Sequence, residues 1–408
     1  MKKIQLLKRF FKKTVVPKLD CVAVDSSVID ESNVTEELIC NENFNNEDIS
    51  EDINQQSLNS STKSTSDDSL IVPVNVISES QQQSAPQLQQ KQNDPSLTID
   101  ITDISESNNT EQQTIMTNST AFAIDADEWI IIGASVIGNG HISAKLPCQD
   151  NHKYEYLGNG WGLAITSDGA GSAEKSHVGS KLVTDCCIIR FKSLIKREGW
   201  IIKKDLPTDV EWYRHSYLAL KTVRDDLDNF SQKNNISLEL MNATVIVVIH
   251  TPHGILAVHI GDGRAGYKSE KGEWKSILTP HKGEEANQTI FLTSKFWENY
   301  PYVMSSVSVP EAVVVREKPY SFTLMSDGCE RSAWQYYQKD EQTGIFYDPN
   351  IPHPPFFNPL CETLQSFRID KVDYIERQEK WRKFITNGTK SFEREKDDKT
   401  MILGVMCK

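Results

Sequence analysis

Residues 162–171, with the sequence GLAITSDGAG, set the fold of the chain because they join an apolar run to an acidic turn. Gly162–Thr166 is typical of a strand, and Asp168 with a following glycine stands at its end. The same arrangement recurs where Tyr320–Met325 precedes Asp327 and another glycine. Both segments therefore predict a strand that carries a carboxylate to its end.

Two further acidic positions have similar surroundings. Asp397 and Asp398 lead into an apolar strand at Thr400–Met406, and Asp150 ends the tetrapeptide PCQD. Aspartates that distant strand ends bring together are typical ligands of hard divalent cations. Turn chemistry is the alternative explanation of any single Asp-Gly pair, but it does not explain four such stations.

The remaining periodic segments predict both strands and helices. Strands are expected at Trp129–Val136, Thr244–His250 and Ile255–Ile260, and the turn Thr251–Gly254 makes the last two a hairpin. Helical spacing of apolar residues predicts three helices, over Glu174–Lys196, Tyr213–Phe230 and Val372–Phe384. Strands in pairs with helices between them indicate an α+β layered domain.

Charge divides the 408-residue chain, whose formal net charge is -13, into three parts. Residues 1–20 sum to +6, residues 21–128 to -19 and residues 129–408 to zero. The middle part is rich in Ser, Asn, Gln and Thr, and it has too few apolar residues to offset its ordering entropy. We therefore predict a disordered acidic linker at 21–125 and a folded domain at 126–408.

The first 20 residues form a basic segment in which Ile4, Leu7, Phe11 and Val15 fall near one helical face. Such a segment is typical of contact with anionic lipid or an acidic partner, and a solvated tail is the alternative. No apolar h-region follows the basic residues, and no stretch approaches the roughly 18 apolar residues of a membrane span. We therefore expect a cytoplasmic protein.

The eight cysteines contain no Cys-x-x-Cys spacing, and none has an arginine six residues later. This excludes a zinc knuckle and gives no support to a cysteine nucleophile. Reduced, mostly buried thiols are expected. The zero net charge of the folded domain argues against nucleic-acid binding.

Six motifs stand in a fixed order in the folded domain: PCQD at 147–150, SDGAG at 167–171, NAT at 242–244, IGDGR at 260–264, SDG at 326–328 and DDKT at 397–400. Together they resemble the metal-dependent protein phosphatase family of type 2C, in particular its bacterial branch with the Pro-Cys-Gln-Asp signature. The resemblance implies a β-sandwich of two antiparallel sheets flanked by helices, in four layers, over about residues 129–408.

The resemblance also implies a centre with two Mn²⁺ or Mg²⁺ ions. Asp168 would bridge both ions and the carbonyl of Gly169 would bind one of them, while Asp327 and Asp397 would hold the other. Asp150 would reach the ions through water. Asp262 and Asp327 would share a third ion, as in some members of the family.

The chain departs from the family pattern at the groups that surround the ions. Ala170 stands where many members have a histidine that assists the leaving group, so His141 becomes the candidate acid, with His152 or His177 as an alternative. The phosphate-binding arginine of the family has no evident equivalent, and Lys145 lies near its place. A lysine acts as a point charge where arginine forks onto two oxygens.

The function implied is a serine/threonine phosphoprotein phosphatase in which a hydroxide that bridges the metals attacks the phosphoryl group directly, without a phosphoenzyme. Phosphate monoesters hydrolyse very slowly in water, and paired cations are the usual solution. A catalytically weak regulatory module that binds metal or phosphoprotein is the alternative. In either case the expected partners are phosphorylated proteins.

Overall fold

The structure, a computed structural model, describes four stretches of the chain, 129–281, 289–298, 302–304 and 307–407. The basic segment at 1–20 and the acidic linker at 21–125 lie outside the described residues, so the statements about them stay predictions. None of the described helices is long and apolar enough to cross a membrane.

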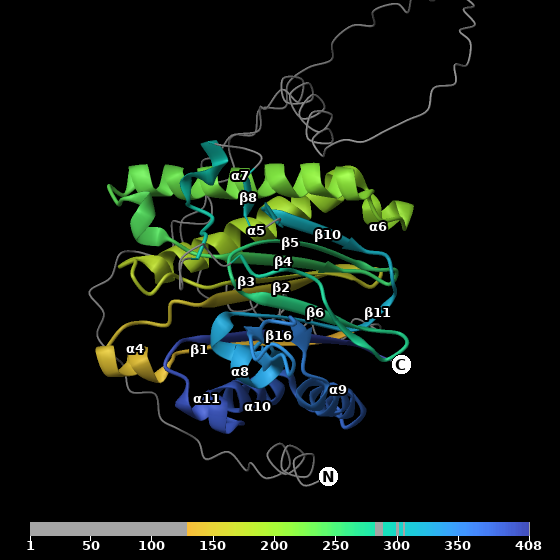
Figure 1. Ribbon diagram of the computed structural model, residues 1–408. Coiled ribbons are helices and arrows are strands. Elements are labelled where there is room, and N and C mark those ends of the chain that lie inside the picture. The colour runs from red at the N-terminus through yellow and green to blue at the C-terminus, as the bar shows by residue number, and fades with distance from the viewer. Residues whose placement is uncertain (1–128, 282–288, 299–301, 305–306, 408) are drawn as a thin grey trace, which may run out of the picture. The chain divides into compact units, whose positions relative to one another are not determined.

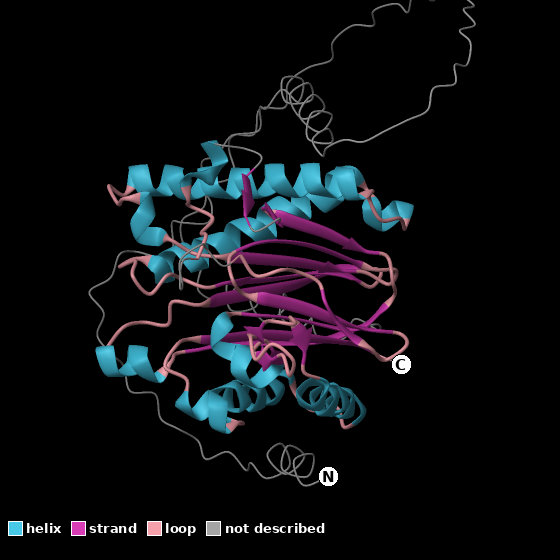
Figure 2. Cartoon of the chain, viewed as in Figure 1, coloured by secondary structure: helices cyan, strands magenta, loops and turns pink. Residues whose placement is uncertain are grey.

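Two five-stranded antiparallel sheets form a sandwich (Figure 2). The first has the order β1 (Trp129–Val136), β16 (Lys399–Met406), β11 (Pro319–Met325), β6 (Arg264–Ser269) and β7 (Trp274–Ser276). The second has the order β10 (Glu311–Val315), β5 (Ile255–Ile260), β4 (Val245–His250), β3 (Trp161–Ser167) and β2 (Asn151–Gly158). The predicted α+β sandwich is confirmed.

Helices cover the outer face of each sheet (Figure 1). On the second sheet lie α5 (Ser176–Glu198) and α7 (Asp209–Lys233), and on the first lie α9 (Pro354–Ile369) and α10 (Tyr374–Asn387). The shorter helices are α4 (Asn139–Ala144), α6 (Trp200–Lys203), η3 (Leu238–Met241), η4 (Lys295–Glu298), η5 (Asp327–Cys329), α8 (Glu330–Ala333) and α11 (Lys390–Arg394). Three short strand pairs complete the described part: β8 (Tyr302–Met304) with β9 (Val307–Val309), β12 (Trp334–Gln335) with β15 (Ile351–Pro352), and β13 (Gln338–Lys339) with β14 (Phe346–Tyr347).

Most predicted elements have the expected type. β1 and β5 have the predicted bounds, and β4 and β5 form the predicted hairpin with His250 opposite Ile255. The three predicted helices correspond to α5, α7 and α10. α7 starts before the predicted Tyr213 because Thr208 and Glu211 form a capping box, in which each side chain accepts a hydrogen bond from the backbone of the other residue.

The apolar space between the sheets encloses an uncharged histidine. His250 is fully buried at the end of β4, and its ring stacks on Phe322 at 4.9 Å and tilts against Trp129 at 4.7 Å. Burial lowers the pKa of His250 to about 3, although a contact with the backbone of Gly160 opposes the shift. The imidazole is therefore neutral in the folded protein at neutral pH.

This histidine makes the fold sensitive to acid. In the unfolded chain the pKa of His250 is near 6.5, so the unfolded state takes up a proton below that pH while the folded state does not. The contribution of the neutral imidazole to stability is therefore present above pH 6.5 and is lost as the pH falls toward 3. Between pH 7 and pH 5 the loss is about 2 kcal/mol. The free energy of unfolding, measured with urea, should fall between pH 7 and pH 5 in the unsubstituted chain. We expect this fall to be smaller by about 2 kcal/mol in His250→Leu, which has no imidazole to protonate. An unchanged difference would contradict this account of His250.

Candidate metal centre

Five aspartates lie at one end of the sandwich because each adjoins the end of a strand. Asp168 directly follows β3 and Asp150 directly precedes β2, and these strands pair in antiparallel register. Asp262 comes two residues after β5, Asp327 two residues after β11, and Asp397 two residues before β16. In Figure 1 this is the end of the sandwich next to α4.

The backbone around Asp168 is fixed from both sides by Thr244. The amide of Asp168 donates to Thr244 Oγ1 at 3.0 Å, and the amide of Thr244 donates to the carbonyl of Asp168 at 2.8 Å. Gly169 forms a bridge to Ala243, and a Cβ at Gly169 would lie 2.5 Å from the carbonyl oxygen of Gln149. Only glycine therefore fits beside Asp168.

The carboxylates of the five aspartates share one electrostatic environment. Burial raises the pKa of Asp168 well above its usual range, and four further carboxylates add to the shift, those of Asp150, Asp327, Asp262 and Asp397. The pKa of Asp327 is also well above its usual range, through burial and then through Asp262 and Asp397. The structure thus brings together the aspartates that the sequence predicted as metal ligands.

Asp150 is held by a serine from the opposite sheet. Ser326 donates its hydroxyl to Asp150 Oδ2 at 2.7 Å and accepts a hydrogen bond from the amide of Thr400 at 2.9 Å. Burial raises the pKa of Asp150 to about 7, with the Ser326 hydrogen bond opposing the shift. Ser326 therefore ties β2, β11 and β16 together at the site.

The donor set fits hard divalent cations. The chain supplies carboxylate oxygens and the carbonyl of Gly169, which are the ligands that Mg²⁺ and Mn²⁺ prefer. Asp327 Oδ1 is buried and has no hydrogen-bond partner among the described residues, so it is available to a cation. Clustered carboxylates repel one another when ionised, and a bound cation removes this cost.

The candidate acid His141 lies at the edge of the aspartate cluster. Its Nδ1 is 2.9 Å from Asp398 Oδ1, but the two atoms are not aligned as a hydrogen bond, so the pair attracts only when the imidazole is protonated. Burial raises the pKa of Asp397, and the nearby His141 opposes this shift. One alternative, His152, has a pKa lowered to about 4 by burial, so its imidazole is neutral near pH 7 and is a poor proton donor.

Asp398 organises the loops around the site. Its buried carboxylate accepts hydrogen bonds from the amide of Gly138 at 2.7 Å and the amide of Gln149 at 2.5 Å. A Cβ at Gly138 would lie 2.3 Å from the backbone of Asp397, so this loop packs directly on the segment that carries Asp397. By contrast, Lys145 is exposed at the C-terminal cap of α4, and its role as a phosphate-binding cation stays a prediction.

His281 fixes the turn that carries Asp262. The amide of His281 donates to the carbonyl of Gly261 at 2.8 Å, and the amide of Gly261 donates to His281 Nδ1 at 3.2 Å. Gly261 has φ +125°, and a Cβ there would lie 2.5 Å from the side chain of Thr244. The carboxylate of Asp262 also accepts a hydrogen bond from Thr289 at 2.7 Å.

A second cluster of possible ligands, His259, His281 and Glu311, supports this turn and is not a metal site. Their ligand atoms lie within 4.8 Å of one another, and His259 Nε2 is 2.9 Å from Glu311 Oε2. The two rings stack at 4.1 Å. Because His281 Nδ1 accepts from Gly261, the ring proton resides on Nε2, and the neutral ring has no lone pair left for an ion.

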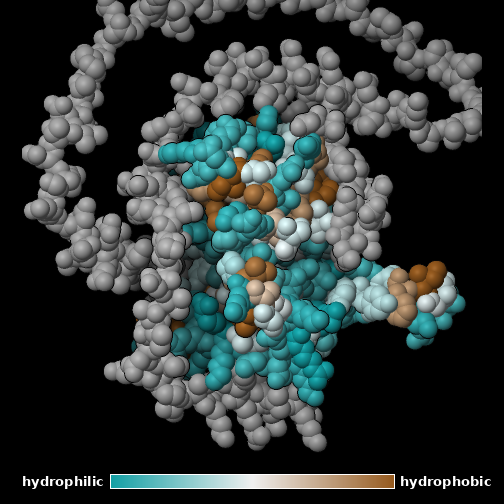
Figure 3. Space-filling model, turned by 90° about the vertical axis from the view of Figure 1, so that its left-hand side faces the viewer, coloured by the Kyte–Doolittle hydropathy of each residue, from teal (hydrophilic) through white to brown (hydrophobic). Residues whose placement is uncertain are grey.

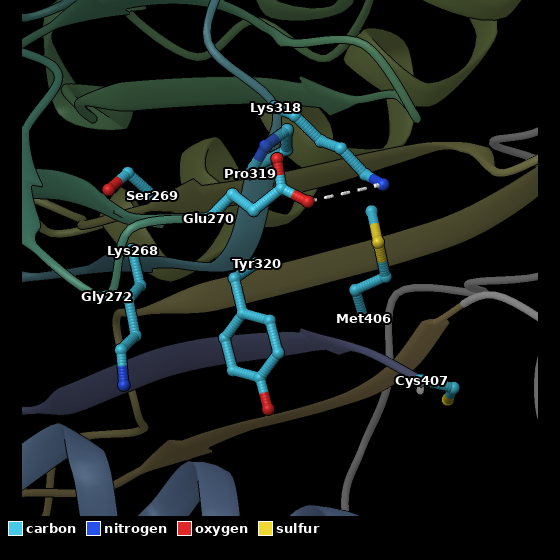
Figure 4. Close-up of a pocket in the computed structure, with 9 residues that line it drawn as sticks. All are labelled: Lys268, Ser269, Glu270, Gly272, Lys318, Pro319, Tyr320, Met406 and Cys407. Atoms are coloured by element: carbon cyan, nitrogen blue, oxygen red, sulfur yellow. Dashed lines mark ion pairs between the residues drawn. The ribbon is translucent and has the colours of Figure 1, made fainter.

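A pocket lies at the opposite end of the sandwich from the aspartate cluster, and no aspartate among the described residues lines it (Figure 4). It has a volume of about 520 Å³ and includes Lys268, Lys318 and Tyr320 in its walls. Lys268 donates to Asn358 Oδ1 at 2.9 Å, and Lys318 is 3.9 Å from Glu270. Both cations of this pocket therefore have partners already.

Three contributors to the site were not predicted from the sequence: Thr244, Ser326 and His281. Thr244 ends the NAT motif and Ser326 begins the SDG motif. The hydroxyl side chains in these motifs were the features of the sequence from which the two contacts could have been predicted. His281 gave no signal, since its partner Gly261 is 20 residues away across β6 and β7.

The chain is similar to several known protein phosphatases. Serine/threonine-protein phosphatase 3 of Escherichia coli (strain K12) is 26% identical over 282 residues, which are 68% of this chain and 98% of that protein. Among solved structures, the catalytic domain of the serine threonine protein phosphatase PstP with 2 manganese ions is 15% identical with a TM-score of 0.39, covering 69% of this chain and 99% of that one. Serine/threonine phosphatase Stp1 from Staphylococcus aureus is 13% identical with a TM-score of 0.40, covering 67% of this chain and 94% of that one.

A family model gives the assignment. The model of the protein phosphatase 2C family matches residues 137–373, which include Asp150, Asp168, Asp262 and Asp327 and end before Asp397. This match covers more than half of the chain. The chain therefore belongs to the protein phosphatase 2C family, a family of metal-dependent protein phosphatases.

Proposed function

We propose that the chain is a Mn²⁺- or Mg²⁺-dependent phosphatase that removes phosphate from serine and threonine side chains of proteins. The observation that carries this proposal is the gathering of five aspartates, from five strand ends, around Asp168. The name of the Escherichia coli relative supports serine/threonine phosphate as the substrate.

The ligands of the proposed ions are assigned as follows. Asp168 would hold both ions, and the carbonyl of Gly169 would hold one of them. Asp327 and Asp397 would hold the other, and Asp327 Oδ1, buried without a hydrogen-bond partner among the described residues, supports its place in this set. Asp150 would act through water, and Asp262 with Asp327 would hold a third ion.

The residues of the chain then position the reactants. The ions, when bound, would supply an activated water and neutralise the charge of the phosphoryl oxygens. Asp150, fixed by Ser326 at 2.7 Å, orients water toward the phosphoryl group. His141, at the edge of the cluster beside Asp397, is the candidate donor of a proton to the leaving oxygen. Lys145 is the candidate cation for the phosphate.

The state of the cysteines supports direct attack by water, without a phosphoenzyme. Cys148 and Cys329 are the thiols near the aspartates, and burial raises the pKa of each, with Asp150 adding to the shift. A thiol with a raised pKa is a poor nucleophile. We therefore propose that the phosphoryl group passes to water and not to a side chain.

Metal removal tests this function against the regulatory alternative. The full chain with Mn²⁺ is expected to hydrolyse a phosphoserine peptide and a generic aryl phosphate, and chelation with EDTA should lower both rates at least about a hundredfold. Added Mn²⁺ should restore them. If the chain binds the phosphopeptide but releases no phosphate with Mn²⁺ or Mg²⁺, the regulatory alternative holds instead.

A further inference from the structure

A small basic pocket lies between α8 and α11, beside the aspartate cluster. Its walls are Arg331, Lys390, Ser391, Arg394 and Glu395, and its volume is about 230 Å³. Sites for small molecules usually enclose about 300–1,000 Å³. This pocket therefore suits a single phosphate or carboxylate group rather than a whole cofactor.

The three cations of the pocket are available to a ligand. In the part of the chain that the structure describes, Arg331, Lys390 and Arg394 form no ion pair with a carboxylate. The acidic member of the pocket, Glu395, is turned to the backbone, where its Oε1 accepts hydrogen bonds from the amides of Lys396 at 2.9 Å and Asp397 at 3.4 Å. Three cations and one engaged carboxylate leave the pocket positive.

The two helices that line the pocket are close in sequence to two of the proposed metal ligands, Asp327 and Asp397. Arg331 follows Asp327 by four residues, which corresponds to about 6 Å along a helix axis. Arg394 precedes Asp397 by three residues, and three residues span at most about 11 Å. The pocket is thus close enough to the aspartates for one polypeptide to reach both.

The arrangement of the two helices is fixed. Ser332 in α8 and Thr389, the N-terminal cap of α11, share a hydrogen bond of 2.7 Å between their hydroxyls. Phe392 of α11 is buried against Phe356 and Phe384 in the core beneath the first sheet. In Figure 3, which views the end next to α4, hydrophilic teal residues predominate over the lower half of the described surface, where α11 lies.

We propose that this pocket binds a second anionic group of the phosphoprotein substrate, next to the phosphate that is hydrolysed. This inference rests on the proposed function and narrows its substrate class to segments with an acidic side chain or a further phosphate close to the phosphorylated residue. Arg331 and Arg394 carry guanidinium groups, which fork onto two oxygens of such a group, and Lys390 adds a point charge. The ligand chemistry is that of an oxyanion.

Matched peptides test the pocket. Three phosphoserine peptides would be compared that differ only in the flanking residues: neutral, acidic, or carrying a second phosphoserine. We expect kcat/KM of the unsubstituted chain to be about tenfold higher for an anionic peptide than for the neutral one, because the guanidinium groups would form charge-assisted hydrogen bonds with the added anion. The ratio should fall toward one in Arg331→Gln and Arg394→Gln. It should be kept in Lys203→Gln, which removes an exposed cation of α6 away from the pocket.

The outcomes separate this inference from the proposed function. If the chain favours both the acidic and the doubly phosphorylated peptide over the neutral one, the pocket binds oxyanions in general. If it favours only one of them, that peptide identifies the anionic group that the pocket binds, a carboxylate or a phosphate. Turnover of all three peptides with equal kcat/KM would overturn the pocket and leave the function standing. Fluorescence anisotropy of the same peptides in EDTA gives a readout without turnover, and equal affinity of the unsubstituted chain and Arg331→Gln for the anionic peptides would also overturn it.

Discussion

Asp168→Asn is expected to abolish metal-dependent hydrolysis, with a loss of at least about a thousandfold in kcat, or roughly 4 kcal/mol of transition-state stabilisation. Asp168 lies at the centre of the cluster, since its pKa is raised by the four other aspartates. An amide keeps the size of the side chain but removes the charge that two cations would share.

The loss should be one of metal binding and not of folding. The substitution removes one of several mutually repelling, buried carboxylates, so the free energy of unfolding without metal is expected to stay equal or to rise. Asp205→Asn, at an exposed position, is the matched control and should keep full activity. An active Asp168→Asn protein, or one that fails only because it is unfolded, would contradict the assignment of Asp168.

Arg264→Ala is expected to destabilise the fold by about 3–5 kcal/mol. Arg264 is completely buried at the start of β6, and its guanidinium donates to Glu330 at 2.8 Å, Asp348 at 2.7 Å and Asn350 at 2.7 Å. Removal of the guanidinium takes one positive charge away from two carboxylates, those of Glu330 and Asp348. One of them, Glu330, already raises the pKa of Asp327 in the metal centre.

Urea unfolding followed by circular dichroism measures this effect. Arg264→Lys should recover only part of the stability, because an ammonium group cannot fork onto three partners. Arg316→Ala is the control, since Arg316 is exposed and lies 3.5 Å from the carboxylate of Asp209, and it should cost less than about 1 kcal/mol. A loss below about 1 kcal/mol in Arg264→Ala would show that the ion pairs of Arg264 do not hold this region.

The sequence predicted those elements whose pattern is local. β1 and β5 are short apolar runs bounded by glycine or turn residues, and both were predicted to the residue. β2 was missed because its sequence, NHKYEYLG, is largely polar and its residues are only partly buried. α9 was missed because it begins with two prolines and contains Pro359, which hides the helical period.

The site was predictable to the extent that strand ends carry it. In an antiparallel sandwich, an aspartate after one strand and an aspartate before the next meet at the same end, so the acidic stations converge. The basic pocket was not predictable, because Arg331 and Arg394 lie on short helices 63 residues apart in sequence. Neither helix is long enough to show a charge pattern, and the hydroxyl contact that joins them is visible only in the structure.

The number of Mn²⁺ ions bound per chain tests the metal centre most directly. Equilibrium dialysis with metal analysis, on the same sample whose phosphate release is measured, should give two or three ions per active chain. The Asp168→Asn protein should lose at least one of them together with its activity. An active chain that binds one ion or none, or an unchanged stoichiometry in Asp168→Asn, would contradict the two-metal phosphatase centre.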